Sequence, residues 1–473
     1  MKADHEKLER AFSPKCIAII GDKKETNYMW LRSHSNFKGK LYSVQVAPEE
    51  IEGIKALGIE NYTSLMDIPE PVDLAIVAVP RAIAPRILGD LVRKDVAAAH
   101  FFTAGFSETD TEEGINLEKT MVEIAEKSNF HIIGPNCMGI FNPSLGVGQG
   151  AAFQEAPVAG PVGLISQSGT HAVTFNRQAS LYGLPINKTV SFGNGIVLDS
   201  PDYLEFFGND PGIKVIGMYI EGVKDGKRFL KVLREVAAKK PVVIWKGGRT
   251  QEGDRAIASH TGSLAVPYTI WDSAVAQCGA VKVSSLDELI DTLKAVYYLP
   301  PVRGNRVGIT GVSGGQSVAI SDAFGEAGLK VPTLTDNSYE ELASFFTLIG
   351  GGYRNPVDTG NQNRREIKRI IEILARDENI DNLALLLAAG MGPGGPPGES
   401  FPKLLIDIKQ STEKPVIAVL AWSFSSGDVE QAGKVMKELQ EGCIPAFVSL
   451  ERGAFALRKA LDYYNLRNGN PGR

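Results

Sequence analysis

One histidine, His260, could carry out phosphoryl transfer. It lies in a stretch of small and polar residues. The stretch reads GGRTQEGDRAIASHTGSLA (247–265) and follows the apolar run PVVIWK (241–246). It shows no apolar periodicity until its end, so we predict a loop, and a loop of that length in a compact domain is usually functional or disordered. Imidazole has a pKa of about 6.5, so at neutral pH much of it is a neutral nucleophile that can accept and release a phosphoryl group. The alternative is a surface histidine on a flexible loop.

A carboxylate that could assist this histidine, Glu221, ends the apolar run IKVIGMYIE (213–221) and precedes Gly222. We expect it at the same sheet edge as the histidine stretch. A carboxylate that accepts a hydrogen bond from one imidazole nitrogen fixes the tautomer and leaves the other nitrogen to attack. The alternative is a solvated glutamate at a strand end.

Two stretches of the chain repeat one pattern of strand, Gly/Ser turn and helix. Residues 162–184 read VGLISQSGTHAVTFNRQASLYGL and residues 307–329 read VGITGVSGGQSVAISDAFGEAGL. An offset of 145 (307 minus 162) aligns Gly163 with Gly308, Ser168 with Ser313, Gly169 with Gly314 and Gly183-Leu184 with Gly328-Leu329. Shared ancestry of two domains without a shared task is the alternative to a common function.

Both turns of this repeat could bind a phosphate-sized anion. Backbone N–H groups and the helix dipole attract an anion at the start of a helix, and Ser166, Ser168 and Thr170 add hydroxyl donors in the first copy. The candidate phosphate-binding residues are Ser166, Ser168, Gly169, Gly314 and Gly315. A capping turn without a ligand is the alternative for either copy, and we interpret His171 as structural.

A third group of turns follows successive apolar runs in the first third of the chain. These turns are IAIIGDKKE (17–25), which turns at Gly21, and VPRA (79–82), TAGFSE (103–108) and GPNCMG (134–139). Ligands bind outside the carboxyl ends of parallel strands, so we expect the turns to face one crevice. Lys23, Lys24 and Arg81 could meet the phosphates of a nucleotide-like ligand there, or be surface charges. Ordinary strand-to-helix turns are the alternative.

An NAD site is disfavoured in this first region. Dinucleotide folds prefer G-x-G-x-x-G in the first turn and an acidic residue at the end of the second strand. Here the second expected strand ends in Val46, followed by Ala47 and Pro48.

The elements that must position these residues are short apolar runs that alternate with amphipathic stretches, a pattern typical of parallel sheets covered by helices. We expect strands at 16–20, 41–46, 74–79, 97–102 and 131–134, then at 162–166, 187–192, 213–221 and 241–246, and finally at 307–310, 383–389 and 415–421. Helices are expected at 82–94, 114–128 and near 285–298. The stretch 142–161 is interpreted as a linker, and LPPVRGN (299–305) as the next boundary.

Composition excludes several other classes of protein. The net charge is -5 over 473 residues, which gives no basic footprint for nucleic acid. No apolar run reaches the roughly 18 residues that cross a bilayer, and MKADHEKLER at the start lacks the apolar core of a signal peptide. Four scattered cysteines without a CxxC pair and six scattered histidines suggest neither disulfides nor a metal cluster. We therefore expect a cytoplasmic protein of two to four domains.

Together these motifs resemble the α subunit of the NDP-forming (ADP-forming) acyl-CoA synthetases of the succinyl-CoA synthetase superfamily. The motifs are IIGPNCMG (132–139), ISQSG (165–169), YIEG (219–222), KGGRT (246–250), SHTGSLA (259–265) and RNPVD (354–358), of which SHTGSLA is the most specific. The resemblance covers nearly the whole chain. It implies an α/β fold with a CoA-binding Rossmann-like domain (1–145) followed by two flavodoxin-like, doubly wound parallel-sheet domains (158–300 and 304–473).

The resemblance also assigns roles to residues. It implies that His260 is the phosphorylated histidine, that Glu221 orients and stabilises it, and that helices starting near Gly169 and Gly314 point their N-termini at it. Such an arrangement would explain the repeat, because a phosphohistidine carries up to two negative charges. The implied CoA contacts are Gly21, Lys23, Val46, Pro80, Ala104, Gly105 and Asn136, and SFGNG (191–195) is a candidate for the acyl pocket.

The activity implied is that of an acid–CoA ligase, which interconverts acyl-CoA, phosphate and ADP with acid, CoA and ATP. The chain has no Walker A sequence and no room for an ATP-grasp module after residue 330. ADP or ATP with Mg²⁺ would then bind a separate ATP-grasp β subunit, in an expected α2β2 heterotetramer. A non-catalytic CoA-binding regulatory subunit of the same fold is the alternative.

The sequence departs from the family pattern in three places. The first turn reads Gly21-Asp22-Lys23 where the family has GAS, and SHTGSLA continues into Val266 and Pro267. The third domain has Ser313-Gly314-Gly315 where Gly-Gly-Pro is usual. The nucleophile is retained in each case.

Overall fold

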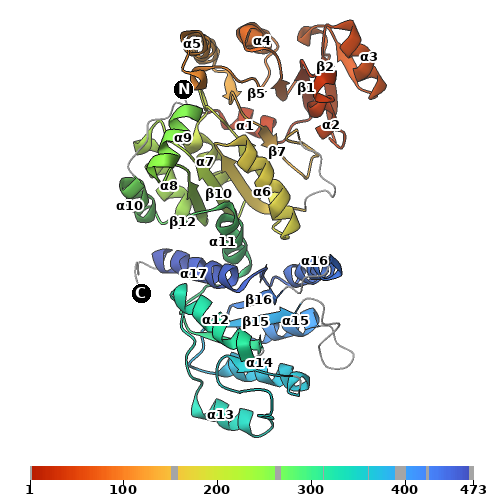
Figure 1. Ribbon diagram of the computed structural model, residues 1–473. Helices are drawn as coiled ribbons and strands as arrows, with labels where there is room; N and C mark the ends of the chain where they lie inside the picture. The colour runs from red at the N-terminus through yellow and green to blue at the C-terminus, as the bar shows by residue number, and fades with distance from the viewer. Residues whose placement is uncertain are drawn as a thin grey trace. The chain divides into compact units, whose positions relative to one another are not determined.

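The chain folds into two compact units. The computed structural model describes residues 3–150, 158–261, 268–312, 314–360, 362–388, 401–421 and 426–467. Unit 1 comprises Met1–Ser180 and Leu184–Leu286, and unit 2 comprises Leu181–Gly183 and Asp287–Arg473 (Figure 1). None of the helices in these described ranges is both long enough and apolar enough to span a membrane.

The first sheet of unit 1 is parallel and has the strand order β3-β2-β1-β4-β5-β6, which is the order of a Rossmann fold. Its strands are β1 (Cys16–Ile20), β2 (Lys40–Val44), β3 (Glu60–Tyr62), β4 (Leu74–Val77), β5 (Ala98–Phe101) and β6 (His131–Ile133). Every residue of β1, β4, β5 and β6 is buried, and these strands are apolar except for His100 of β5 and His131 of β6. The five expected strands are confirmed, whereas the short polar edge strand β3 carries no apolar signal.

Helices surround this first sheet. They are α1 (His5–Phe12), α2 (Met29–Ser33), α3 (Pro48–Ala56), α4 (Ala84–Arg93) and α5 (Glu112–Ser128). Helices α4 and α5 confirm the expected helices at 82–94 and 114–128, and they begin and end within two residues of them.

The second sheet of unit 1 has the order β12-β11-β10-β8-β9-β7. Its strands are β7 (Gly139–Phe141), β8 (Ala159–Ser166), β9 (Ile186–Ser191), β10 (Val215–Ile220), β11 (Val242–Lys246) and β12 (Val281–Val283). Strand β7 was not expected; it lies within the range predicted for the first domain, yet it pairs antiparallel with β9. Within the stretch interpreted as a linker (142–161), Val147 and Gln149 are packed on the protein and each is only 1% exposed, while residues 151–157 lie outside the described part of the chain.

Helices α6 (Gly169–Leu181), α7 (Ser200–Asn209), α8 (Gly226–Ala237), α9 (Gln251–Thr261) and α10 (Tyr268–Gln277) accompany this second sheet. Helix α9 corrects the prediction of a loop for residues 251–261; residues 247–250 lie outside any helix, and residues 262–265 lie outside the described part of the chain. Its one large apolar residue, Ile257, is buried, so the segment packs without any apolar periodicity. The missed signal was Thr250, whose hydroxyl accepts the Gly253 N–H at 3.1 Å, followed by acidic residues in the first turn.

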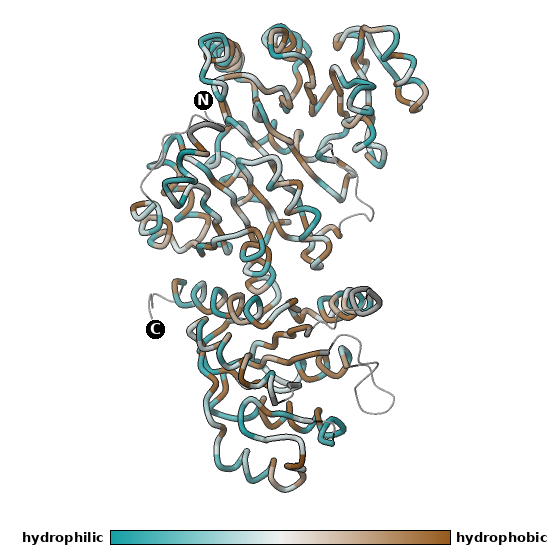
Figure 2. Tube along the Cα trace, viewed as in Figure 1, coloured by the Kyte–Doolittle hydropathy of each residue, from teal (hydrophilic) through white to brown (hydrophobic). Residues whose placement is uncertain are grey.

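Unit 2 contains a parallel sheet of order β14-β13-β15-β16-β17, whose strands are mostly apolar in Figure 2. The strands are β13 (Val307–Val312), β14 (Val357–Asp358), β15 (Asn382–Ala388), β16 (Val416–Ala421) and β17 (Ala446–Phe447). Its helices are α11 (Leu286–Tyr298), α12 (Gly314–Glu326), α13 (Asp336–Ala343), α14 (Ile367–Arg376), α15 (Phe401–Ser411), α16 (Ser426–Glu441) and α17 (Leu450–Arg467). The range predicted for the second domain includes α11, but from Asp287 onward this helix belongs to unit 2. The predicted domain boundaries remain predictions.

The repeated sequence pattern forms the same local structure twice. Helices α6 and α12 each have 13 residues and begin at Gly169 and Gly314. Each is followed by a glycine with positive φ, 66° at Gly183 and 77° at Gly328. In both copies the leucine after that glycine donates its N–H to the carbonyl five residues earlier, at 2.7 and 2.9 Å, as in a Schellman cap.

Candidate functional site

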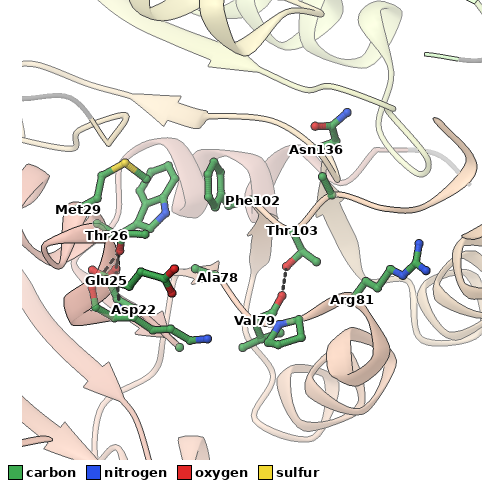
Figure 3. Close-up of a pocket in the computed structure, with 15 residues that line it drawn as sticks. Asp22, Glu25, Thr26, Met29, Ala78, Val79, Arg81, Phe102, Thr103 and Asn136 are labelled. Carbon is green, nitrogen blue, oxygen red and sulfur yellow. Dashed lines mark hydrogen bonds between the residues drawn. The ribbon is translucent and has the colours of Figure 1, made fainter. Parts of the chain in front are cut away.

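A cavity of about 410 Å³ opens at the carboxyl edge of the first sheet (Figure 3). It is lined by Gly21, Asp22, Lys23, Glu25, Thr26, Met29, Trp30, Ala78, Val79, Pro80, Arg81, Phe102, Thr103, Ala104 and Asn136. These residues follow β1, β4, β5 and β6, so the expected convergence of the four turns on one crevice is confirmed. Met29 and Trp30 of α2, together with Phe102, form an apolar wall that the sequence did not reveal.

Five of the seven residues expected to contact CoA line this cavity, namely Gly21, Lys23, Pro80, Ala104 and Asn136. The other two, Val46 and Gly105, are not among its lining residues. The Val46 side chain is 69% exposed beyond the end of β2. The Gly105 N–H donates to the Glu108 carboxylate at 2.6 Å, so this amide is directed into its own turn.

The unusual first turn is organised by Asp22, which is only 2% exposed. Its carboxylate accepts the N–H groups of Lys23 at 3.1 Å and Leu31 at 2.9 Å, and the Thr26 hydroxyl at 3.3 Å. Burial raises the pKa of the Asp22 carboxyl, and these hydrogen bonds oppose the rise. The Asp22 carboxyl therefore already occupies the Lys23 and Leu31 amides, and contacts to ligand phosphates would fall to side chains such as that of Lys23.

Arg81 lies at the other side of the cavity from Asp22 (Figure 3). Its guanidinium donates to the Gly105 carbonyl at 2.8 Å and to the Glu113 carboxylate at 2.6 Å. It thus supports the turn that follows β5. Lys24, the third expected phosphate contact, is not a lining residue of the cavity, and its N–H donates to the Glu50 carboxylate at 2.7 Å.

We expected a phosphate to bind at the turn between β8 and α6 (the phosphate turn). Ser166 is fully buried, and its hydroxyl donates to the Ser168 carbonyl at 2.7 Å. The Ser168 hydroxyl accepts the His171 N–H at 3.3 Å, which caps the start of α6. The hydroxyls of the two serines therefore stabilise the turn itself. An anion would instead be attracted by the dipole of α6, which begins at Gly169.

Glu221 follows β10 directly, and its carboxylate accepts a hydrogen bond from the Tyr219 hydroxyl at 3.2 Å. The Tyr219 ring packs against those of His171 and Trp245, with centroids 4.4 and 4.5 Å away. Burial lowers the pKa of His171, which favours the neutral form of its imidazole. Its place among aromatic rings suits the structural role that we expected.

Helix α9 carries His260 in its last turn; the histidine side chain and residues 262–267 lie outside the described part of the chain. Strands β8, β10 and β11 end at the same sheet edge, so the phosphate turn, Glu221 and the start of α9 share that edge. Helix α9 also packs against η4 (Ser107–Thr109), the turn that follows the cavity loop after β5. Helix α9 therefore lies between the carboxyl edge of the second sheet and the turn after β5 of the first sheet.

A second connection joins the SFGNG segment (191–195) to the cavity. The Asn194 N–H donates to the Pro135 carbonyl at 3.1 Å, and its side-chain amide donates to Glu108 at 2.6 Å. Gly193 approaches Asn136, which lines the cavity, so closely that a Cβ would lie 2.3 Å from the Asn136 carbonyl oxygen. The candidate acyl segment is therefore next to the cavity.

The second copy of the repeat lies in unit 2. Gly314 begins α12 and Gly315 follows it with an exposed backbone, while Ser313 lies outside the described residues. That both copies serve one phosphohistidine stays a prediction. Among the residues that the structure describes, no group of three or more His, Cys, Asp or Glu side chains could hold a metal ion.

Two family models match the chain. Residues 15–143 match a CoA binding domain, and residues 159–296 match the succinyl-CoA ligase like flavodoxin domain. The first range holds the cavity, and the second holds the phosphate turn, Glu221 and α9.

Similar proteins cover nearly the full length. The chain is 36% identical to the α subunit of acetate–CoA ligase [ADP-forming] II of Pyrococcus furiosus, over 93% of this chain and 94% of the relative. It is 33% identical to the α subunit of acetate–CoA ligase [ADP-forming] I of the same organism, over 95% and 96% of the two chains. A solved structure of the dinucleotide forming acetyl-coenzyme A synthetase 1 of Ca. Korarchaeum cryptofilum, in complex with phosphate and ADP, aligns with a TM-score of 0.81 at 28% identity and covers 98% of both chains. The chain therefore belongs to the family of ADP-forming acyl-CoA synthetase α subunits, in the succinyl-CoA synthetase superfamily.

Proposed function

We propose that this chain is the α subunit of an ADP-forming acid–CoA ligase that works through acyl phosphate and a phosphohistidine. The observation that carries the proposal is the arrangement within unit 1. Helix α9, which bears His260, begins at the sheet edge that holds Glu221 and packs against η4 beside the cavity of the CoA-binding domain. Full-length similarity to α subunits named as ADP-forming ligases supports it and favours an enzyme over a non-catalytic CoA-binding subunit.

The reaction would proceed in three steps. A phosphate oxygen attacks the thioester carbonyl, the C–S bond breaks, and CoA leaves as a thiolate that takes up a proton. A nitrogen of His260 then attacks the phosphorus of the acyl phosphate, and the carboxylate leaves with the electrons of the broken P–O bond. The phosphoryl group finally passes from the histidine to ADP, and the reverse direction consumes ATP to form acyl-CoA. A covalent intermediate suits two separate sites because it divides one transfer into two easier ones.

The side chains have distinct parts in this scheme. CoA would lie in the cavity of the first sheet, with Lys23 near its phosphates and Asn136 towards the reacting end, next to SFGNG (191–195). The helix start at Gly169, and in unit 2 that at Gly314 and Gly315, would hold phosphate through backbone N–H groups. Glu221 would accept a hydrogen bond from His260 and stabilise its positive charge as it attacks.

The nucleotide would bind elsewhere. The relatives named as α subunits support a separate partner subunit, and we assign to it an ATP-grasp fold, ADP or ATP with Mg²⁺, and an α2β2 assembly. A cytoplasmic location completes the proposal.

The decisive experiment is to trap the phosphohistidine. The chain, purified with its partner subunit, is incubated with acetyl-CoA and labelled inorganic phosphate. We expect acid-labile, base-stable label on His260 and none in His260→Gln, while His5→Gln, which alters a histidine of α1, keeps the label. Label or full turnover in the His260→Gln complex would overturn the proposal.

A further inference from the structure

Gln167 joins the phosphate turn to Glu221, and neither the family resemblance nor the proposed function gives it a role. It lies between Ser166 and Ser168 in the turn after β8 and is 7% exposed. Its backbone N–H donates to the Tyr219 carbonyl at 2.9 Å. Its side-chain oxygen accepts two backbone N–H groups, from Glu221 at 2.8 Å and from Gly222 at 3.0 Å.

These contacts lie just beyond the last paired residues of two neighbouring strands. Strands β8 and β10 are parallel, and their ladder extends to the pair Ser166 and Tyr219. The Gln167 N–H adds one more backbone bond, and its side-chain oxygen then takes the place of the next carbonyl of the ladder. Glu221 and Gly222 are thereby kept in line with β10, although they lie outside the strand.

The other end of the Glu221 peptide is held as well. The Lys246 ammonium donates to the Glu221 carbonyl at 2.8 Å and also to the Gly247 carbonyl. Lys246 is only 5% exposed, and burial lowers its pKa. With the Tyr219 hydroxyl on the carboxylate, Glu221 is fixed at its N–H, its C=O and its side chain.

A glutamine meets the chemical demands of this position. An amide oxygen can accept two N–H donors at once. It is also neutral, whereas a carboxylate at the same place would add a negative charge to a turn that has to receive phosphate. An asparagine would be one methylene shorter.

We infer that Gln167 is a positioning residue for phosphoryl transfer, which acts by holding Glu221 against the phosphate turn and not by binding phosphate. This inference rests on the proposed function. Displacing a reacting group by about 1 Å can cost about 10²-fold in rate, so the two backbone bonds made by this side chain matter for the chemical step. A glycine follows Glu221, and without the clamp this segment would have wide freedom of rotation.

The test is a double-mutant cycle on the complex with its partner subunit. Gln167→Met keeps the length of the side chain and removes the acceptor. With acetyl-CoA and labelled phosphate, we expect it to slow single-turnover labelling of His260 by about tenfold and to leave the KM for phosphate within about twofold. In a Glu221→Gln background the same change should cost less than about twofold, because its effect passes through the carboxylate.

Gln167→Glu gives a second, independent readout. It keeps an acceptor oxygen, so labelling at saturating phosphate should stay within about threefold of wild type, while the added charge raises the KM for phosphate. Gln410→Met, the same change at an exposed site of α15, is the matched control and should alter neither quantity.

The outcomes separate the two proposals. A wild-type complex that turns over without labelling His260 contradicts the proposed function itself. If the wild type is labelled and Gln167→Met slows labelling equally with and without the Glu221 carboxylate, or acts wholly on the KM for phosphate, only the role of Gln167 is overturned. Should Gln167→Met fail to fold, Gln167→Glu decides, since a large loss at saturating phosphate with the acceptor in place is incompatible with positioning.

Discussion

Replacing Lys294 by methionine should remove a rise in stability between about pH 8 and pH 10.5. Lys294 lies on α11 and is 1% exposed, and its ammonium donates to the Ala446 carbonyl. Phe447 presents its ring 4.7 Å from the ammonium, and Asp291 lies at 4.0 Å. Arg452 competes for the same carboxylate, at 2.5 Å from Asp291.

The magnitude follows from the cost of burying this cation. Burial lowers the pKa of Lys294 from 10.5 to about 8, against the attraction of Asp291 and with some repulsion from Arg452. At about 1.4 kcal/mol for each unit of pKa, the difference corresponds to about 3 kcal/mol. Between the two values the unfolded chain holds a proton that the native chain has lost, so the free energy of unfolding rises with pH in this window.

Urea unfolding of wild type and Lys294→Met, followed by circular dichroism from pH 7.5 to pH 10.5, measures the effect. The stability of wild type relative to the variant should increase by about 3 kcal/mol across the range, because other titrating groups are common to both chains. Lys368→Met, an exposed lysine of α14, controls for the loss of a surface charge. If the difference in the free energy of unfolding between wild type and Lys294→Met stays constant with pH, burial does not lower the pKa of Lys294 and the reasoning is refuted.

Three glycine substitutions probe the repeat and the site. Gly183→Ala, at φ 66°, places a Cβ 1.4 Å from the Gln440 side chain and should lower the free energy of unfolding by about 2–4 kcal/mol. Gly328→Ala, at φ 77°, meets only the flexible end of an arginine and should lower it by about 1–2 kcal/mol. Equal losses in urea unfolding would contradict this packing difference. Gly247→Ala puts a Cβ 2.7 Å from the Tyr219 hydroxyl, which donates a hydrogen bond to the Glu221 carboxylate. Because the new methyl group breaks this hydrogen bond, the kcat of the complex should fall about tenfold. Turnover at the wild-type level would show that this hydrogen bond is dispensable.

Much of the fold could be predicted because its strands are buried on both faces. Runs such as CIAII in β1 and VVIW (242–245) in β11 are continuous and apolar, and the turns after strands contain the glycines and serines of helix starts. The repeat was visible in the sequence because a helix start and a Gly-Leu cap are local features. The convergence of four turns on one cavity followed from parallel strands alone.

Other features depended on partners far away in the sequence. The three residues of β7 have no local strand signal and join the second sheet only because β9 offers an edge. Helix α9 has a single large apolar residue, Ile257, so no apolar periodicity marks it, and its burial depends on segments outside the helix.

The sequence by itself determined which residue types stand at the ends of the strands: the glycines and serines of the phosphate turn, Glu221 after β10 and a histidine beyond β11. Only the tertiary structure decided how they are held. A glutamine that reads as one letter of a turn motif reaches the backbone of Glu221, 54 residues away, and a lysine in the last turns of α11 binds a carbonyl 152 residues away. Periodicity and caps are encoded within a few residues, whereas contacts of this kind exist only once parallel strands and packed helices have brought distant segments together.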